Sequence, residues 1–435
     1  MRLRLSEIAR VTGGRLEGAD VEVAGATIDS RSVEPGQLFV PIVAERDGHD
    51  FIPAALAAGA VGYLTARPPT DGNAVVVEDT AAALAALGRH AREHLGEAHV
   101  VGVTGSVGKT SVKDLLAAAL AARWRTSASV RSFNNELGVP LTLLNAPDGT
   151  EALVVEMGAR DRGHVKALCD LALPTVGIVT RVAAVHTEVF GTIDDVAVAK
   201  AELVEALPAT GTAVLNAADP RVAAMADRTP ARVVTFGTGG DVRAEDVSLG
   251  RDLRPSFRLV SPWGETRVDL EARGTHMVDN ALAAAAAALA CDVPVDALPA
   301  ALAAASLSPW RMEVVELPSG AVVINDAYNA NPTSMAAALQ ALAALPARRR
   351  VAVLGVMAEL GTTTDADHAA IGALAAELGV DVVSVGVAAY GGTLVDDVAA
   401  AHAVLGALAD GDAVLVKASR VAALERLAAL LAATL

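Results

Sequence analysis

A glycine-rich segment near residue 105 has the residue types of a phosphate-binding loop. It follows the apolar run 99–104, precedes a helical pattern, and consists of Gly105, Ser106, Val107, Gly108, Lys109, Thr110 and Ser111. Glycines let backbone N–H groups turn toward phosphate oxygens, the lysine adds positive charge, and a hydroxyl can reach Mg²⁺. The strict pattern needs a glycine where this chain has Val103, so it is only partly matched. The segment predicts ATP or GTP binding, and the alternative is a glycine-rich turn without a ligand.

Three ionisable residues follow or flank the next apolar runs. Glu156 ends the run 152–156, His186 follows the run 175–182, and Lys200 lies in the helical segment 194–207. Ligands of open α/β sheets bind outside the carboxyl ends of the strands, so Glu156 and His186 are candidates to face the loop. Carboxylates suit Mg²⁺, whereas imidazole is an unusual ligand for it. On residues alone, Glu156 as a helix cap and His186 as a satisfied loop histidine stay open alternatives. For Lys200, a solvated helix lysine paired with a neighbouring acid is the favoured interpretation.

A turn rich in asparagine follows another apolar run, 321–324. It contains Asn325, Asp326, Tyr328, Asn329 and Asn331, directly before the helical segment 333–345. Turn residues after a strand are ordinary, but this density of amide, acid and phenol groups exceeds the needs of a connector. Such groups can hydrogen-bond a peptide-like or ribose-bearing ligand while adding little charge.

The elements that would position these groups form three stretches. Residues 98–308 alternate apolar runs with helical runs, apart from an antiparallel-looking part at 241–270, and a second alternating set follows Pro309. This alternation predicts mostly parallel sheets covered by helices on both faces. We therefore expect an α/β fold of three domains: a smaller N-terminal domain over 1–97, a central nucleotide-binding domain over 98–308 and a Rossmann-like C-terminal domain over 309–435.

Composition narrows the class of protein. The 435 residues are 53% hydrophobic and carry a formal charge of −16, which disfavours disorder and non-specific nucleic-acid binding. Two cysteines are too few for a disulfide framework, and the longest uncharged stretch, 327–347, contains Asn, Pro, Ser and Gln. The start of the chain has no apolar core of the signal-peptide kind. We expect a soluble cytoplasmic protein.

Several segments together resemble the Mur ligase family, the ATP-dependent amide-bond-forming enzymes of peptidoglycan precursor synthesis. They are TGSVGKTS (104–111), SFNNELGVPLTLL (132–144), VVEMGARDRGH (154–164), NDAYNANPTSM (325–335), GVMAELG (355–361), KASR (417–420) and the region 28–51. The loop resembles a shortened phosphate loop of that family, which accounts for Val103. The Tyr-Asn-Ala-Asn-Pro turn resembles the members that use D-alanyl-D-alanine, and differs from the other Mur ligases and from folylpolyglutamate synthase.

The resemblance implies roles for these residues. Lys109 would hold the β- and γ-phosphates, Thr110 and Glu156 would bind Mg²⁺, and His186 would complete a second metal site. Lys200 matches a lysine that CO₂ carbamylates into an oxygen ligand for Mg²⁺, which reverses its interpretation as a solvated lysine. The other implied contacts are Asn280, Arg311 and Asp326 for ATP; Ser30, Arg31 and His49 for the uridine nucleotide; Asn134 and Asn135 for the UDP-sugar and tripeptide; and Tyr328, Asn329 and Asn331 for the dipeptide. Met277 and Val356 depart from residues common in relatives.

The implied reaction joins D-alanyl-D-alanine to UDP-N-acetylmuramoyl-tripeptide through an acyl phosphate, with ATP and two Mg²⁺ ions, in a monomer. One alternative is another Mur-type ligase with a different amine. The others are a non-catalytic nucleotide-binding scaffold of cell-wall synthesis and a motor or signalling NTPase.

Overall fold

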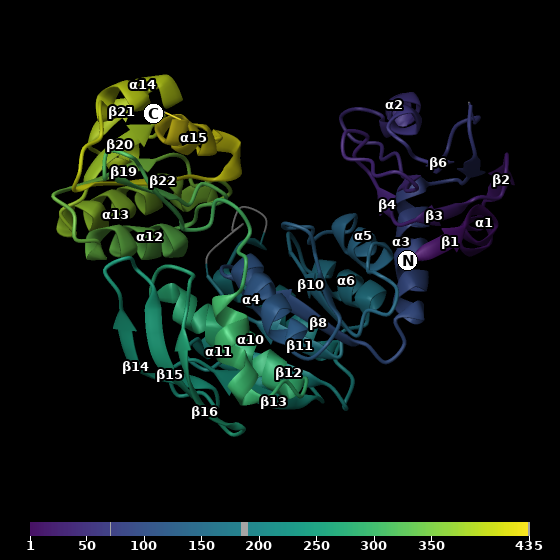
Figure 1. Ribbon diagram of the computed structural model, residues 1–435, viewed down its shortest axis with the longest axis horizontal. Helices are drawn as coiled ribbons and strands as arrows, with labels where there is room; N and C mark the ends of the chain where they lie inside the picture. The colour runs from purple at the N-terminus through teal and green to yellow at the C-terminus, as the bar shows by residue number, and fades with distance from the viewer. Residues whose placement is uncertain (70, 184–189, 434–435) are drawn as a thin grey trace.

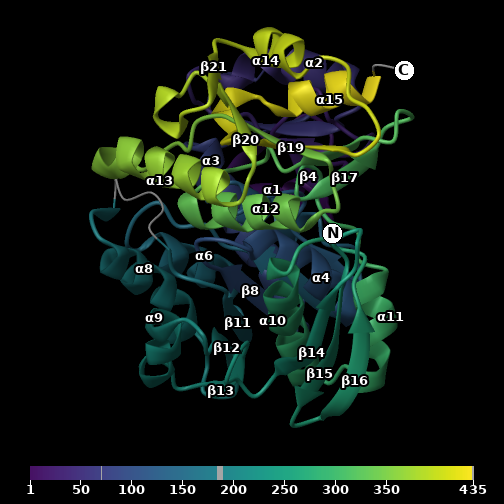
Figure 2. The same ribbon diagram turned by 90° about the vertical axis from the view of Figure 1, so that its left-hand side faces the viewer.

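The computed structural model describes residues 1–69, 71–183 and 190–433, whose strands form five sheets. Figure 1 shows the N-terminal and C-terminal parts on opposite sides of the central part, and Figure 2 shows the molecule with the C-terminal part toward the viewer. In the described ranges, no sheet crosses the predicted boundaries near residues 97 and 308. The boundaries themselves stay predictions.

The N-terminal part contains a small five-stranded sheet and a separate two-stranded one. Its elements are β1 (Arg2–Arg4), α1 (Leu5–Thr12), β2 (Arg15–Glu17), β3 (Glu22–Ala24), β4 (Ala26–Thr27), β5 (Leu38–Phe39), η1 (Gly48–Phe51), α2 (Ile52–Ala57), β6 (Gly62–Thr65), β7 (Ala74–Val76) and α3 (Thr80–His94). The larger sheet has the order β2-β7-β6-β5-β4, and only β2 is antiparallel to its neighbour. The short runs over 36–43 and 72–77 form strands of only two and three residues, β5 and β7.

Helix α3 attaches this part to the central part. The Asp79 carboxylate caps its first turn by accepting from the backbone N–H groups of residues 81 and 82. Leu84 and Leu87 are fully buried, and a Cβ at Gly88 would lie 2.7 Å from the Cα of Pro140 in the central part. Arg92 Nε donates to Ala172 O at 2.8 Å. The helix therefore packs directly against two central elements.

The central part is a six-stranded parallel sheet with helices on both faces, as predicted. Its elements are β8 (His99–Thr104), α4 (Lys109–Ala121), β9 (Thr126–Ala128), α5 (Gly138–Leu144), β10 (Ala152–Glu156), α6 (His164–Ala172), β11 (Val176–Val179), α8 (Ile193–Glu205), β12 (Thr212–Asn216), α9 (Pro220–Ala223), η2 (Ala224–Arg228), β13 (Arg232–Phe236), β14 (Arg243–Leu249), β15 (Pro255–Ser261), β16 (Gly264–Asp269), α10 (His276–Ala290), η3 (Val295–Ala297) and α11 (Leu298–Ala303). The sheet order is β13-β12-β11-β8-β10-β9. Strands β14, β15 and β16 form the antiparallel sheet expected over 241–270.

Side chains that alternate between the two faces explain why the middle of β8, residues 100–103, is apolar. Val100 points into the core that contains α6 and α8, whereas Val101 and Val103 point into the core that contains α4 and α10. A strand buried on both faces needs apolar residues at every position. The alanine-rich α10 packs against α4 with the alanines of 281–288 fully buried, so this alanine run is a core helix rather than low-complexity sequence.

The C-terminal part repeats this plan. Its elements are β17 (Glu313–Glu316), β18 (Val322–Asn325), α12 (Pro332–Ala344), β19 (Arg349–Leu354), η4 (Gly361–Thr363), α13 (Thr364–Glu377), β20 (Asp381–Val385), η5 (Ala388–Tyr390), β21 (Thr393–Val395), α14 (Val398–Leu405), β22 (Asp412–Lys417), η6 (Arg420–Ala422) and α15 (Glu425–Ala433). The sheet order is β17-β18-β22-β19-β20-β21, with β17 antiparallel at one edge. The polypeptide enters this part at Ser308, whose N–H donates to Asp114 Oδ2 of α4 at 2.7 Å.

No helix within the described ranges is long and apolar enough to cross a bilayer.

Candidate active site

The predicted phosphate loop joins β8 to α4 at the carboxyl edge of the central sheet. Gly105 has φ +148° and Gly108 has φ +86°, values that L side chains rarely adopt. A Cβ at Gly108 would lie 2.6 Å from Asn280 Oδ1, and a Cβ at Gly105 would overlap Thr180 Oγ1. Thr180 Oγ1 also donates to Val107 O at 2.6 Å. Both glycines are therefore required by the fold of the loop.

Lys109 is the first residue of α4, and its side chain turns back over the loop. Its Nζ donates to Gly105 O at 2.7 Å. Burial lowers the pKa of Lys109; the Glu156 carboxylate opposes this shift, and the Arg311 guanidinium adds to it. An anion in the loop would favour the protonated lysine. The geometry therefore suits Lys109 to hold a phosphate.

Thr110, Glu156, Asn134 and Arg311 form one hydrogen-bonded cluster. Thr110 Oγ1 donates to Glu156 Oε2 at 2.7 Å and accepts from Arg311 Nη2 at 2.8 Å. Asn134 Nδ2 donates to Glu156 Oε1 at 2.8 Å. Glu156 ends β10 and is 1% exposed, which excludes an exposed helix cap. The hydroxyl and carboxylate oxygens of Thr110 and Glu156 are hard ligands of the type that Mg²⁺ prefers.

Lys200 lies on the buried face of α8, contrary to the solvated position that its sequence neighbours suggest. It is 3% exposed, and no described residue forms a hydrogen bond or ion pair with its Nζ. Burial and the nearby Lys109 ammonium hold the pKa of Lys200 well below its ordinary value. The side chain lines the same cavity as the loop. His186, predicted to complete a second metal site, lies outside the described residues.

Asp326 follows β18 and is held by a lysine of β22. Lys417 Nζ contacts Asp326 Oδ2 at 2.5 Å and donates to Asn329 O at 2.9 Å, while Met312 N donates to Asp326 Oδ1 at 3.1 Å. His276, at the start of α10, lies close to this pair: burial lowers its pKa, and Asp326 opposes that shift. The carboxylate of Asp326 is thus fixed at the border between the central and C-terminal parts.

The remaining residues of the asparagine-rich turn divide into two groups. The Tyr328 ring lies under the Arg311 guanidinium, 4.3 Å from its carbon, and its hydroxyl contacts Ser132 Oγ of the central part. Asn331 instead caps α12, accepting from Ser334 N at 2.9 Å, and Asn329 Oδ1 accepts from the next backbone N–H. Tyr328 therefore bridges two parts of the chain, while the two amides also have ordinary turn roles.

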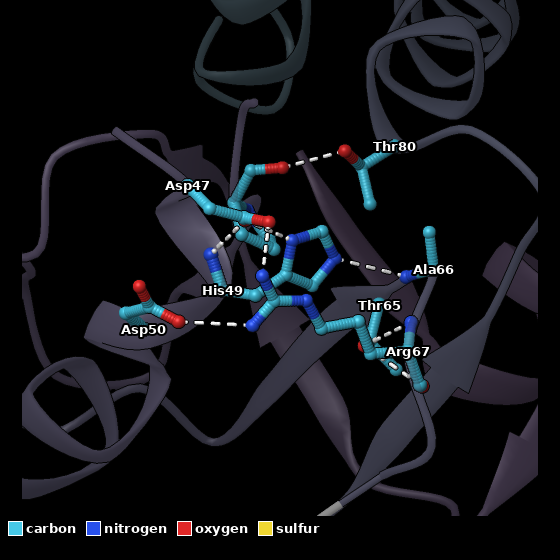
Figure 3. A network of polar contacts seen from close by, with 8 residues as sticks. Asp47, His49, Asp50, Thr65, Ala66, Arg67 and Thr80 are labelled. Atoms are coloured by element: carbon cyan, nitrogen blue, oxygen red, sulfur yellow. Dashed lines mark hydrogen bonds and ion pairs between the residues drawn. The ribbon is translucent and has the colours of Figure 1, made fainter. Parts of the chain in front are cut away.

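The three predicted uridine-nucleotide residues lie outside this cluster and do not line the cavity. Arg31 forms an ion pair with Asp29 at 2.8 Å, and Ser30 is part of the same loop. Figure 3 shows the buried His49 ring, whose Nδ1 lies 2.6 Å from Asp47 Oδ1 and whose Nε2 accepts from Ala66 N at 3.0 Å. Both ring nitrogens are thus engaged within the N-terminal part. His49 positions the loops around it, and its ligand role stays a prediction.

One cavity of about 1310 Å³ unites the loop, Lys200 and the asparagine-rich turn. All three parts line it, including Ile28 from the N-terminal part. Its charged side chains are nearly balanced in sign, although the whole chain carries −16: Lys109, Arg160, Arg181, Lys200, Arg311 and Lys417 against Glu136, Glu156, Asp279, Asp326 and Glu359. The cavity therefore lacks the strong negative charge of the chain as a whole, so an anionic ligand meets less repulsion there than on an average part of the surface.

Other predicted residues surround the same space. Asn280 lies over Gly108, with its Nδ2 3.4 Å from Met277 Sδ. Asn135 lines the cavity while its Oδ1 accepts from Gly138 N at 2.9 Å, and Ser111 lines it beside Thr110. Val356 is absent from the lining among the described residues.

Sequence reasoning gave no role to several charged residues of the cavity. Arg160 is exposed in the cavity and forms no ion pair with any described residue, whereas Arg181 pairs with Asp279 at 3.5 Å. Lys417 and Arg160 both lie in segments that carried the family resemblance, KASR and VVEMGARDRGH. Their position in these segments could have marked both as site residues. No sequence feature indicated Arg181 or His276.

Comparison with known proteins agrees with this geometry. Residues 103–288 match the family model for the Mur ligase middle domain, and residues 310–420 match that for the Mur ligase, glutamate ligase domain. The UDP-N-acetylmuramoyl-tripeptide–D-alanyl-D-alanine ligase of Mycobacterium tuberculosis is 43% identical, over 87% of this chain and 82% of that protein. This chain belongs to the Mur ligase family.

Solved Mur ligases share its fold over nearly the whole chain. A crystal structure of MurF from Acinetobacter baumannii aligns with a TM-score of 0.89 and 30% identity, covering 99% of each chain. The MurF ligase of Thermotoga maritima in complex with ADP aligns with a TM-score of 0.81 and 29% identity, covering 94% of this chain and 97% of that one. The two Mur ligase domain matches include Lys109, Glu156 and Lys200 in the first and Arg311 and Asp326 in the second.

Proposed function

We propose that this chain is an ATP-dependent ligase that joins D-alanyl-D-alanine to UDP-N-acetylmuramoyl-tripeptide, giving the UDP-pentapeptide used for peptidoglycan synthesis. The observation that carries the proposal is the shared cavity, which has the phosphate loop on one side and the asparagine-rich turn on the other. The names of relatives such as the M. tuberculosis enzyme specify this substrate pair. The bound ADP in the T. maritima relative supports the assignment of the loop to ATP.

The chemistry requires activation of a carboxylate, because oxide is a poor leaving group. The tripeptide carboxylate attacks the γ-phosphorus of ATP, giving an acyl phosphate and ADP. The amine of D-alanyl-D-alanine then attacks the acyl carbon, and the tetrahedral intermediate expels phosphate to form the amide. Lys109 and Arg311 would offset the negative charge that accumulates between the γ-phosphate and the attacking carboxylate. Mg²⁺ held by Thr110 and Glu156 would supply further charge neutralisation.

Lys200 is suited to carry a carbamate. Its lowered pKa favours the neutral amine, whose lone pair is needed to attack CO₂. The reaction consumes one amine and one CO₂ and gives a carbamate anion and a proton. The product places an anionic group with two oxygen atoms inside the cavity, close to the Lys109 ammonium, and those oxygens could bind a second Mg²⁺.

Arg160 is suited to bind a carboxylate of the UDP-linked peptide. Among the arginines of the described cavity lining, Arg181 pairs with Asp279 and Arg311 donates to Thr110, whereas the Arg160 side chain forms no ion pair or hydrogen bond with a described residue. A peptide carboxylate would supply the missing charge, and the hydrogen bonds would fix the register of the peptide.

Tyr328, Asn329 and Asn331 would contact the incoming dipeptide, and Asn280 and Asp326 would contact the nucleotide. Ser30 and Arg31 would contact the uridine nucleotide from the N-terminal part. We expect a monomer in the cytoplasm, where ATP and UDP-linked precursors are available.

The test is phosphate release by the purified chain with Mg²⁺, ATP, UDP-N-acetylmuramoyl-tripeptide and D-alanyl-D-alanine, omitting each component in turn. Release that needs both substrates, with the UDP-pentapeptide detected by mass spectrometry, would support the proposal. Release only with a different amine would assign another Mur-type ligase. ATP binding without turnover under any combination would assign a scaffold, and release without either acceptor would assign a simple NTPase.

A further inference from the structure

A second cluster of metal-ligating side chains lies on the N-terminal part, outside the cavity. Glu7 of α1 and His90 and His94 of α3 each offer a ligand atom, and these atoms all lie within 4.8 Å of one another. The two histidines are four residues apart and therefore project from the same face of α3. Neither Glu7 nor either histidine lines the catalytic cavity.

The contact made by His94 already favours a metal-binding tautomer of its ring. His94 Nδ1 lies 2.9 Å from His90 O, so its N–H donates to that carbonyl and its Nε2 lone pair is left for a metal. His90 Nε2 lies 3.1 Å from Glu7 Oε1. Two donors on one tetrahedral zinc ion are about 3.3 Å apart, given ligand distances of about 2.0 Å. The Glu7–His90 pair is thus already near ligand spacing, and the His94 ligand atom lies within 4.8 Å of both, so it would move by less than about 2 Å to reach that spacing.

We propose that Glu7, His90 and His94 bind one zinc-class divalent ion, with water completing its coordination. Two imidazoles and a carboxylate are borderline and hard ligands that suit Zn²⁺, whereas Mg²⁺ prefers oxygen ligands alone. The ion would take the place of the proton in the His90–Glu7 hydrogen bond, and that proton would be released to solvent. Arg10 Nη2 lies 3.6 Å from Glu7 Oε1 and weakens the site by repelling a cation.

The ion would cross-link α1 to α3. Helix α3 is the element whose Arg92 donates to Ala172 O of the central part, so the cross-link would stiffen the attachment of the N-terminal part. The two cysteines do not compete for zinc, because both are buried and burial raises the pKa of each thiol to about 12.

The experiment is calorimetric titration of the full chain with Zn²⁺ in excess Mg²⁺, with hydrogen exchange of α1 and α3 as a second readout. We expect saturable binding of one ion per chain at micromolar or lower concentration, with slower exchange in both helices. His94→Ala and Glu7→Gln should each weaken binding at least tenfold, Arg10→Ala should tighten it, and His402→Ala, in the C-terminal part, should leave it unchanged.

Because His94 is exposed, its alanine variant should keep the wild-type fold, and the hydrogen-exchange pattern without zinc checks this directly. No saturable binding, or equal binding by the wild type and His94→Ala, would overturn the proposal. Neither result depends on ligase activity, so this test and that of the proposed function can fail separately.

Discussion

Replacing Lys200 with methionine should stabilise the central part of the protein while abolishing ligase turnover. The wild-type side chain is 3% exposed, and burial together with Lys109 holds its pKa well below the ordinary value. In the unfolded chain the same amine is protonated up to pH about 10.4. Folding at neutral pH therefore requires Lys200 to lose a proton or to stay charged in a buried site beside the Lys109 ammonium. Methionine fills a similar volume and avoids that requirement.

The pH dependence gives the magnitude. Between the lowered folded pKa and pH about 10.4, the unfolded state binds one more proton than the folded state at this site. The wild-type free energy of unfolding therefore rises with pH in this window, by about 1.4 kcal/mol per pH unit from this group. The methionine side chain does not titrate, so it adds no pH dependence to the free energy of unfolding of the variant. The stability advantage of Lys200→Met should shrink by about 1.4 kcal/mol for each pH unit within the window.

The assay is urea unfolding in CO₂-free buffer at several pH values, followed by tryptophan fluorescence. Two of the three tryptophans, Trp124 and Trp263, belong to the central part. Lys166→Met is the matched control, because the exposed Lys166 pairs with Asp170 and its pKa is raised. The stability that this pair contributes is lost only above pH about 10.4. The difference in unfolding free energy between the wild type and Lys166→Met should therefore stay constant from pH 7 to 9. A pH-independent difference for Lys200→Met would refute the reasoning.

Three further changes test other parts of the argument. Glu156→Gln should keep the hydrogen bond from Thr110 but lower Mg²⁺-dependent turnover about 100-fold or more, because the metal loses an anionic ligand; steady-state rates at several Mg²⁺ concentrations check this. Arg160→Ala should raise KM for the UDP-tripeptide about tenfold with little change in kcat. The control is Arg162→Ala, whose wild-type residue pairs with Asp195, and it should leave KM and kcat unchanged. Equal effects of the two substitutions would contradict the assignment of Arg160 to the peptide carboxylate. His49→Ala should destabilise the loops around it by roughly 1–3 kcal/mol by leaving a backbone N–H unpaired, measured as faster hydrogen exchange over 41–67.

Local patterns were sufficient to predict the central architecture. Strand β8, the glycine loop and α4 are consecutive in sequence, so apolar alternation followed by glycines and a helical run determines all three. The same holds for β18, the asparagine-rich turn and α12. Short edge strands such as β9, β17 and β21 were not predicted, because three or four residues carry too little pattern and depend on their neighbours for pairing.

Burial of single polar residues could not be predicted in this way. Lys200 has acidic neighbours in sequence, yet α8 places it under the phosphate loop; only the family resemblance indicated this. His49 is a second case, since the sequence did not indicate that both of its ring nitrogens are engaged within the N-terminal part; its predicted ligand role stays a prediction. In both cases the neighbour that matters belongs to a different element: Lys109 of α4 for Lys200, and Ala66 after β6 for His49. Tertiary packing, which local sequence patterns do not show, brings each pair together.

Thr110 shows how the site depends on such partners. A hydroxyl has one hydrogen and two lone pairs. The hydrogen goes to Glu156 and one lone pair accepts from Arg311, which lies 201 residues further along the chain. One lone pair therefore remains for a metal ion, so Mg²⁺ can bind Thr110 without breaking either contact. The contact from Arg311 can thus persist when the nucleotide binds. Through Thr110, the phosphate loop is hydrogen-bonded both to Glu156 of β10 and to Arg311 of the C-terminal part. All three can therefore contact the same bound ligand.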